Sequence, residues 1–418
     1  MKLKHLGIFL LLSTMAVFSA CSDDDDDKGG VDLAQEIKGD YFGALDVTVS
    51  EDVAEPTSNI INATAIAKNE IQLDLKEFTY IEGGIGIKIR DIKLEKIKLK
   101  GKEGDIELTE NTQTIKISVG GAPIDAKVKT NGTVKGKKMS LVLDIDAAGL
   151  DIEVKFNGDL LGDVASTLYD MEEEWGLEVD QEGGEVYGYL PGPKGYWGSS
   201  NIGAIFLSGF TKKGLCVTQS EESRNGKYAV RIETLDSKGG NMFGQTIPKV
   251  TSGSLFLGKF DLGQLEHGTL ECTQFGIPFD KKPLSLSAYY KYTSGGVFYR
   301  VPEGGTIDKP ETAPEGTKDK CSINAVLYEI SSDDDAYITG KDTYSDPRIV
   351  AKAMFTSGDT DGYKLFSVNF DYVEGKTYDK SKKYRFAIIA SSSAEGNSFS
   401  GAPDSVLYLD DIEVTYEK

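Results

Sequence analysis

The sequence predicts an all-β protein with two domains, an antiparallel barrel followed by a sandwich or jelly roll. Apolar and polar residues alternate with a period of two over many short runs, as in strands with one face in a core. The composition adds 47 Gly, 20 Tyr and 18 Phe among 418 residues, which is typical of turn-rich β proteins. The length suits two or three domains.

Residues 1–20 have the parts of a secretory signal peptide. A basic start is followed at residues 6–18 by an apolar core that is too short to span a bilayer. The sequence FSAC at residues 18–21 resembles a bacterial lipobox, which implies lipidation of Cys21. The alternative is an ordinary secretory peptide with a chance cysteine.

An acidic run follows Cys21 directly, with five aspartates at residues 23–27. Residues 21–30 are therefore expected to be a lipidated acidic tether. The run resembles the export signal of Bacteroidota-type lipoproteins, which implies a lipid-anchored place on the outer membrane, facing the exterior. A solvated spacer, extended by charge repulsion, is compatible with the same residues.

Residues 31–160 form the first predicted domain. The alternation of residues 141–145 and 152–156 and turn signals such as those at residues 120–121 and 131–132 predict an antiparallel meander, which closes into a barrel because closure removes exposed edges. Its motifs are GDYFG at residues 39–43, LKEF at 75–78 and TVKGKKMS at 133–140. Together they resemble the calycin-like β-barrel domain. The resemblance implies either a barrel that holds an apolar ligand or one filled by its own side chains.

Residues 161–170 are expected to be a linker, with apolar positions at helical spacing. The second domain is predicted at residues 171–418, with strands at 229–232, 284–292, 323–330, 364–370, 384–390 and 406–416. Residues 301–320 are rich in Pro, Gly and charge, and are predicted to be an exposed loop without core residues.

Charge, cysteine and histidine content exclude several classes of protein. A net charge of −21 without a basic patch argues against nucleic-acid binding. Cys216, Cys272 and Cys321 form no CxxC pair and leave open either one disulfide with a leftover thiol or three buried thiols. His267 alone remains after the leader, too few imidazoles for a zinc hydrolase.

The second domain resembles the PCMD family of carbohydrate metabolism domains, a jelly roll akin to carbohydrate-binding modules. The motifs lie at residues 196–201, 226–234, 253–258, 276–279, 282–283, 288–292, 325–329, 390–393 and 407–414. In such modules an aspartate of the last strand commonly ligates a structural calcium ion. The resemblance implies Asp411 as that ligand, with Glu173 and the backbone oxygen of Asn225 or Lys227. The alternative is an aspartate capped by backbone amides or an arginine, without a metal.

Aromatic residues are the candidates for a sugar site, because an aromatic ring packs under the apolar face of a sugar. Tyr196 and Trp197 lie in a predicted loop rich in Pro and Gly, and Asn201 is beside them. Tyr290 and Tyr292 share one face of a predicted strand, and Tyr289 lies on the other. The alternative for these aromatics is the core of the sandwich.

The expected function is non-catalytic glycan binding at the cell surface, as an accessory to polysaccharide uptake or metabolism. The expected partners are the outer membrane through the lipid, a polysaccharide or oligosaccharide, and other surface proteins. A carbohydrate-active enzyme is the first alternative, although no pair of carboxylates stands out among the 67 acids. A structural or adhesive surface protein is the second.

Overall fold

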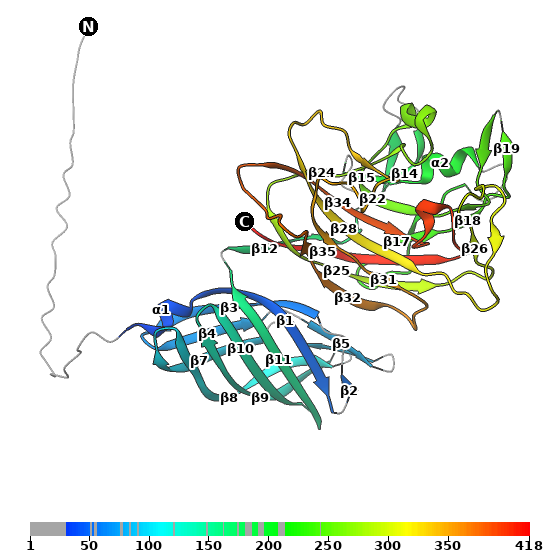
Figure 1. Cartoon of the computed structure of the whole chain (residues 1–418). Coiled ribbons are helices and arrows are strands. Elements are labelled where there is room, and N and C mark those ends of the chain that lie inside the picture. Colours follow the sequence, from blue (N-terminus) through cyan, green and yellow to red (C-terminus); the bar gives the residue numbers. More distant parts are fainter. Residues whose placement is uncertain are drawn as a thin grey trace, which may run out of the picture.

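The computed structural model describes residues 31–418 apart from gaps at 51, 54–56, 76–77, 83–84, 90–91, 120–121, 148, 162, 174, 180–185, 191–195, 208–213 and 243. The leader, with Cys21 and the acidic run, lies outside the described residues. Two all-β bodies follow each other along the chain (Figure 1). Within the described part, no helix is long and apolar enough to cross a membrane.

The first body is a closed antiparallel barrel, as predicted, and the ring has eight strands. The eight are β1 (Gly39–Val49), β3 (Thr57–Ala67), β4 (Glu70–Leu75), β7 (Ile92–Lys102), β8 (Asp105–Val119), β9 (Ala122–Lys135), β10 (Lys138–Ala147) and β11 (Leu150–Leu160). Pairing of β8 with β9 closes the ring. The short strand β2 (Asp52–Val53) pairs with β1, and the hairpin of β5 (Phe78–Glu82) and β6 (Ile85–Ile89) extends from β8.

Alternating burial fills the barrel from within. Along β10, Met139, Leu141, Leu143 and Ile145 are buried, and the residues between them are exposed or half-buried. Helix α1 (Leu33–Ile37) buries Leu33, Ala34 and Ile37 in the same apolar cluster. The Tyr41 hydroxyl donates a hydrogen bond of 2.9 Å to the carbonyl of Ile37, which ties the helix to β1.

The second body is a jelly roll of two sheets. The first sheet contains β12 (Val164–Tyr169), β16 (Val217–Ser220), β17 (Ala229–Glu233), β25 (Lys282–Thr293), β32 (Lys364–Asn369) and β35 (Val406–Glu417). The second contains β15 (Trp197–Ser199), β22 (Ser254–Phe260), β23 (Thr273–Phe275), β24 (Ile277–Phe279), β28 (Cys321–Ile330), β29 (Ile338–Thr339), β30 (Ile349–Ala353), β31 (Thr356–Ser357), β33 (Asp371–Tyr372) and β34 (Lys383–Ser391). All six long runs predicted as strands in this domain are confirmed.

Two-stranded ribbons and short helices lie outside the two main sheets of the jelly roll. Four two-stranded ribbons pair β13 (Gly176–Val179) with β14 (Val186–Leu190), β18 (Leu235–Asp236) with β21 (Val250–Thr251), β19 (Gly240–Met242) with β20 (Gln245–Ile247), and β26 (Tyr299–Arg300) with β27 (Glu311–Thr312). The helices are α2 (Asn201–Phe206) and the 3-10 turns η1 (Leu262–His267) and η2 (Gly396–Ser398). Among the described residues, Cys216, Cys272 and Cys321 are buried free thiols. Of the two alternatives left open by the sequence, this is the one with three buried thiols and no disulfide.

The expected helical character of the linker is wrong. Residues 164–169 form strand β12, which pairs antiparallel with β35 from Val164 opposite Glu417 to Tyr169 opposite Ile412. The edge of β35 offers backbone partners that outweigh a weak helical pattern. The linker therefore contributes a strand to the jelly roll and brings the barrel against its first sheet.

The loop at residues 301–320 does contain a buried residue. Asp319 is 1% exposed, and its Oδ2 accepts hydrogen bonds from the Ser393 hydroxyl at 2.6 Å, the Ala402 N–H at 2.8 Å and the Ser405 hydroxyl at 2.9 Å. The prediction of a loop without core residues is wrong because it counted only apolar side chains. A carboxylate with this many donors can be buried.

Candidate functional site

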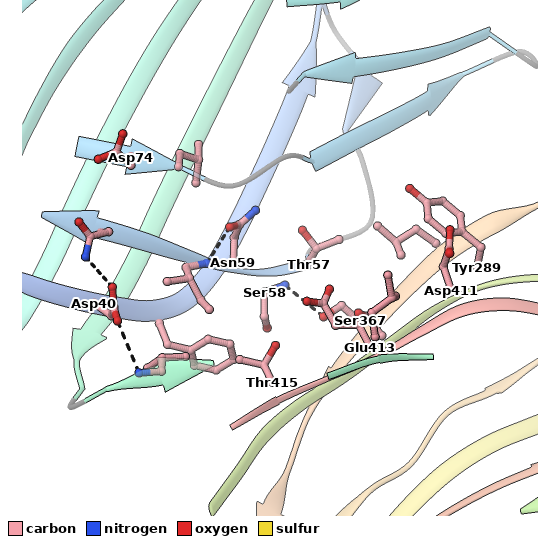
Figure 2. Close-up of a pocket in the computed structure, with 18 of the residues that line it drawn as sticks. Asp40, Thr57, Ser58, Asn59, Asp74, Tyr289, Ser367, Asp411, Glu413 and Thr415 are labelled. Carbon is pink, nitrogen blue, oxygen red and sulfur yellow. Dashed lines mark hydrogen bonds between the residues drawn. The ribbon is translucent and has the colours of Figure 1, made fainter. Parts of the chain in front are cut away.

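A cavity of about 720 Å³ lies between the barrel and the first sheet of the jelly roll. The barrel wall comes from β1, β3 and β4, and the jelly-roll wall from β12, β25, β32 and β35. Figure 2 shows Asp40 and Asp74 on the barrel side, with Asp411 and Glu413 facing them from the other domain. The volume is within the range of about 300–1,000 Å³ that is usual for small-ligand sites.

Polar contacts across the domain boundary hold the two walls together. The Ser58 N–H donates to the Ser367 hydroxyl at 3.3 Å, and the Ser58 hydroxyl donates to Asn369 Oδ1 at 2.7 Å. Asp40 Oδ1 accepts from the Asn62 side chain at 2.7 Å, and its Oδ2 faces the Val164 N–H at 3.5 Å. Side chains along β1 and β3 point alternately into and out of the barrel. These short polar residues are at outward-pointing positions, so they line the cavity instead of filling the barrel core.

The jelly-roll wall is shaped by a bulge in β35. Ser287 of β25 lies opposite Glu413, but Tyr289 lies opposite Asp410, so β35 has one more residue than β25 between these pairs. Asp411 is at the bulge with a φ of 47°, in the left-handed region that an aspartate tolerates better than most residues. The bulge lets Asp411 and Glu413 both line the cavity.

Tyr289 connects the cavity to a cluster of tyrosine rings and cations on the outer face of the same sheet. The Arg224 guanidinium lies 4.8 Å from the centre of the Tyr289 ring. The Lys291 ammonium lies 4.4 Å from the Tyr408 ring and 6.0 Å from the Tyr363 ring. Tyr289, Tyr363 and Tyr408 are all half-buried, so part of each ring remains open to solvent.

Asp410, next to the bulge, is completely buried. Its carboxylate accepts hydrogen bonds from the backbone N–H groups of Arg224 at 2.7 Å, Asn225 at 3.2 Å and Asp411 at 2.9 Å. Burial raises the pKa of Asp410 to about 6 although these N–H groups oppose the rise. The residue is not among those that line the cavity, so its role in this arrangement is to hold the 224–225 turn against β35.

The structure separates the residues predicted to bind a glycan. Trp197 is 3% exposed and meets the Tyr169 ring edge-on at 5.4 Å between centres. Asn201 is buried and bonds both the N–H and the carbonyl of Val217, at 2.9 Å each. Tyr290 and Tyr292 lie in the core between the sheets. Tyr196, at 48%, is the exposed ring of the set and lies outside the cavity lining.

The residues predicted to bind calcium are only partly brought together. Asn225 and Asp411 line the cavity, and the Asn225 side-chain amide donates a hydrogen bond to Asp411 Oδ2. Glu173 and Lys227 are exposed and are not among the lining residues. Calcium needs several oxygen ligands around one point. Among the described residues, no group of three or more His, Cys, Asp or Glu side chains is placed to hold a metal.

Glu172, next to the predicted Glu173, occupies the turn at residues 226–228. Its carboxylate accepts from the N–H groups of Lys227, at 2.8 and 3.0 Å, and Tyr228, at 3.0 Å. Gly226 has a φ of 58°, in the left-handed region that favours glycine, and a Cβ there would displace the Glu172 carboxylate, whose Oε1 lies 2.2 Å away. The Glu172 carboxylate thus accepts N–H groups in this structure, and the calcium ion stays a prediction.

The fold and the cavity define a two-domain, all-β protein with a polar site between its domains. The model of the family described as "Putative carbohydrate metabolism domain" (PCMD) matches residues 174–415, and the calycin-like β-barrel domain model matches residues 37–159. The first match covers more than half of the chain, so the chain belongs to the PCMD family. No curated protein matches it.

Matches among solved structures come from several bacteria. A "putative glycoside hydrolase" from Bacteroides thetaiotaomicron is 24% identical, with a TM-score of 0.48, and the match covers 93% of this chain and all of that one. A second, from Bacteroides vulgatus, is 26% identical over 59% of this chain and 96% of that one, with a TM-score of 0.46. A family 11 carbohydrate-binding module from Clostridium thermocellum is 12% identical over 54% of this chain and 92% of that one, with a TM-score of 0.24.

Proposed function

We propose that the chain binds a neutral glycan in the cavity between its domains and does not cleave it. The observation that carries the proposal is the composition of the two walls. A half-buried tyrosine ring, Tyr289, lies among hydroxyl, amide and carboxylate groups, the combination that suits the apolar face and hydroxyl rim of a sugar. Membership of a family named for carbohydrate metabolism supports the same class of ligand.

The charge of the cavity favours neutral over acidic glycans. Four carboxylates line it, those of Asp40, Asp74, Asp411 and Glu413, and no Lys, Arg or His is found among the described lining residues. Uronic acids and sulfated sugars would bring like charges into this site, at a cost that grows as water is excluded. Carboxylates accept hydrogen bonds from sugar hydroxyl groups and so favour neutral chains.

A glycan array with the soluble chain, residues 28–418, tests the proposal. We expect binding to one or more neutral polysaccharides, none to polyuronates, and no release of reducing ends. Replacing Tyr289 with Ala is expected to weaken binding about tenfold or more, because the stacking ring is lost. Tyr196→Ala is the control, since that exposed ring lies outside the cavity.

Three outcomes of this experiment would change the assignment. Binding to no glycan contradicts the function, and loss of binding in Tyr196→Ala but not in Tyr289→Ala moves the site to the loop predicted from the sequence. Release of reducing ends supports a carbohydrate-active enzyme instead. An arm with EDTA tests calcium, because a lower melting temperature or lost binding would support the ion, and unchanged melting would count against it.

We also propose that the protein works as a lipid-anchored protein on the outer membrane, facing the exterior, as an accessory to polysaccharide uptake. The support is the leader, with its FSAC sequence and acidic run. Replacing Cys21 with Ala is expected to move the protein from the membrane fraction to the soluble fraction. Protease treatment of intact cells should remove the wild-type protein. A Cys21→Ala variant that stays with the membrane would contradict lipid anchoring.

A further inference from the structure

A second cavity, of about 330 Å³, lies on the far side of the jelly roll. Its floor is the outer face of the second sheet, where Ser322 of β28 and Ile389 of β34 point away from the core that Ile323 and Ile388 enter. Residues of α2, the β19–β20 ribbon, η1 and η2 form its walls. Both sheets therefore separate it from the cavity between the domains.

Where the structure describes it, the lining of this second cavity contains no charged side chain. None of its 28 described lining residues is Asp, Glu, Lys, Arg or His, although 27% of all residues in the chain are charged. Burial raises the pKa of Cys272, which lines the cavity, to about 11, so its thiol is neutral at physiological pH. A charged ligand would find no counter-charge here and would lose its hydration.

Several hydroxyl groups around the cavity are already bonded within the protein. The hydroxyl groups of Ser252 and Ser391 lie 2.8 Å apart, and Ser391 also donates to the carbonyl of Ser393 at 2.9 Å. Thr273 donates to the carbonyl of Leu270, also at 2.9 Å. A ligand therefore does not have to satisfy these groups, and the cavity presents mainly carbon to it.

The backbone of Phe399, a residue that lines the cavity, has an unusual conformation. Phe399 has a φ of 55° and a ψ of 30°, a left-handed conformation that is uncommon for a bulky residue and costs energy. Its ring lines the cavity together with Leu265, which is 37% exposed. A strained backbone that places an aromatic ring in an apolar cavity is the kind of outlier found at ligand sites.

We propose that this cavity binds an uncharged, apolar small molecule, about the size of a two-ring aromatic or a short acyl chain. An engineered apolar cavity of about 150 Å³ in another protein holds benzene, and this one is roughly twice as large. The site is distinct from the proposed glycan site in place, charge and ligand class, and it stands without that proposal.

A matched pair of fluorescent probes tests whether the cavity prefers an uncharged ligand to a charged one. N-phenyl-1-naphthylamine is neutral, and 1-anilinonaphthalene-8-sulfonate has the same rings with an added sulfonate. We expect the neutral probe to bind the full-length chain saturably with one site, and the anionic probe to bind at least tenfold more weakly. Absence of saturable binding by the neutral probe, or equal binding of both probes, overturns the proposal.

Gly203 of α2 gives a variant that fills the cavity. It lines the cavity, and a Cβ there would meet Phe260 at an ordinary contact distance of 3.6 Å, so a larger side chain can start from this position without a clash at its first atom. Gly203→Leu is expected to reduce binding of the neutral probe at least tenfold. Gly296→Leu makes the same chemical change at an exposed glycine with no atom within 4 Å of its Cβ, and should leave binding unchanged.

Two further measurements keep the test decisive. If Gly203→Leu does not fold, Leu265→Asp replaces it, because this exposed residue brings a charge to the mouth without disturbing the core. The Tyr289→Ala variant must retain probe binding, since Tyr289 lies beyond both sheets. Binding that survives either cavity variant, or that is lost in Tyr289→Ala, places the probe elsewhere and overturns the proposal.

Discussion

Replacing Asp319 with Ala is expected to lower the free energy of unfolding of the jelly roll by about 3–5 kcal/mol. The side chain accepts hydrogen bonds from two serine hydroxyls and two backbone N–H groups, and it is 1% exposed. Its removal takes the acceptor from four donors, three of which belong to buried residues. Calorimetry should show a drop of roughly 10 °C in the transition of this domain.

Asp319→Asn is the matched control, because it keeps the shape and one acceptor oxygen. It is expected to lose less stability than Asp319→Ala. If the two variants melt within a degree of each other and of the wild type, the buried network does not hold the 301–320 loop in place.

The same residue predicts a pH dependence. Burial raises the pKa of Asp319 above its ordinary value of 3.8, against the opposing effect of its hydrogen bonds. The folded state thus binds the proton more tightly than the unfolded state. This contribution is complete below about pH 4 and is lost as pH rises through the folded pKa. The advantage of wild type over Asp319→Asn should therefore shrink between acidic and neutral pH.

Replacing Gly43 with Ala is expected to lower the free energy of unfolding of the barrel by about 3 kcal/mol or more. This value is at the upper end of what ordinary overpacking costs. Gly43 of β1 lies opposite Gly158 of β11, and a Cβ at Gly43 would come 2.0 Å from the Asn157 carbonyl oxygen and 2.3 Å from the Gly158 Cα. These are backbone atoms of a paired strand and cannot rotate away. The two strands would have to separate.

Circular dichroism melts should show an earlier barrel transition, and glycan binding should fall with it because β1 forms part of the cavity wall. Ala44→Ser adds one atom at the adjacent exposed position and serves as the control. Wild-type melting of Gly43→Ala would show that β1 and β11 are farther apart than this structure has them.

The fold was predictable from the sequence where burial follows a period of two. Strand β10 alternates as its letters do, and β25 sends Tyr290 and Tyr292 inward and Tyr289 outward. Strand β12 was not predictable, because its partner β35 is almost 250 residues away and supplies the edge that decides its conformation. The burial of Asp319 was not predictable for the same reason, because its hydrogen-bond donors Ser393 and Ser405 come from distant segments.

The candidate site was less predictable than the fold. The alternation separated Tyr289 from its neighbours, but an exposed tyrosine alone does not indicate a cavity. The cavity exists because a second domain faces that strand, and residues such as Asn59 and Asn62 gave only a weak signal as polar groups on an outward barrel face. The bulge at Asp411 depends on a left-handed backbone conformation. An aspartate can adopt this conformation, but its presence in the sequence does not predict a bulge.

The cavity between the domains has a mechanical consequence, because it belongs to neither domain alone. Short polar contacts, such as Ser58 with Ser367 and Asn369, join the walls directly. A ligand that touches both walls binds best to the arrangement in which they face each other, and it must stabilise that arrangement by the same free energy. Ligand binding would then favour one relative arrangement of the two domains and reduce their motion against each other.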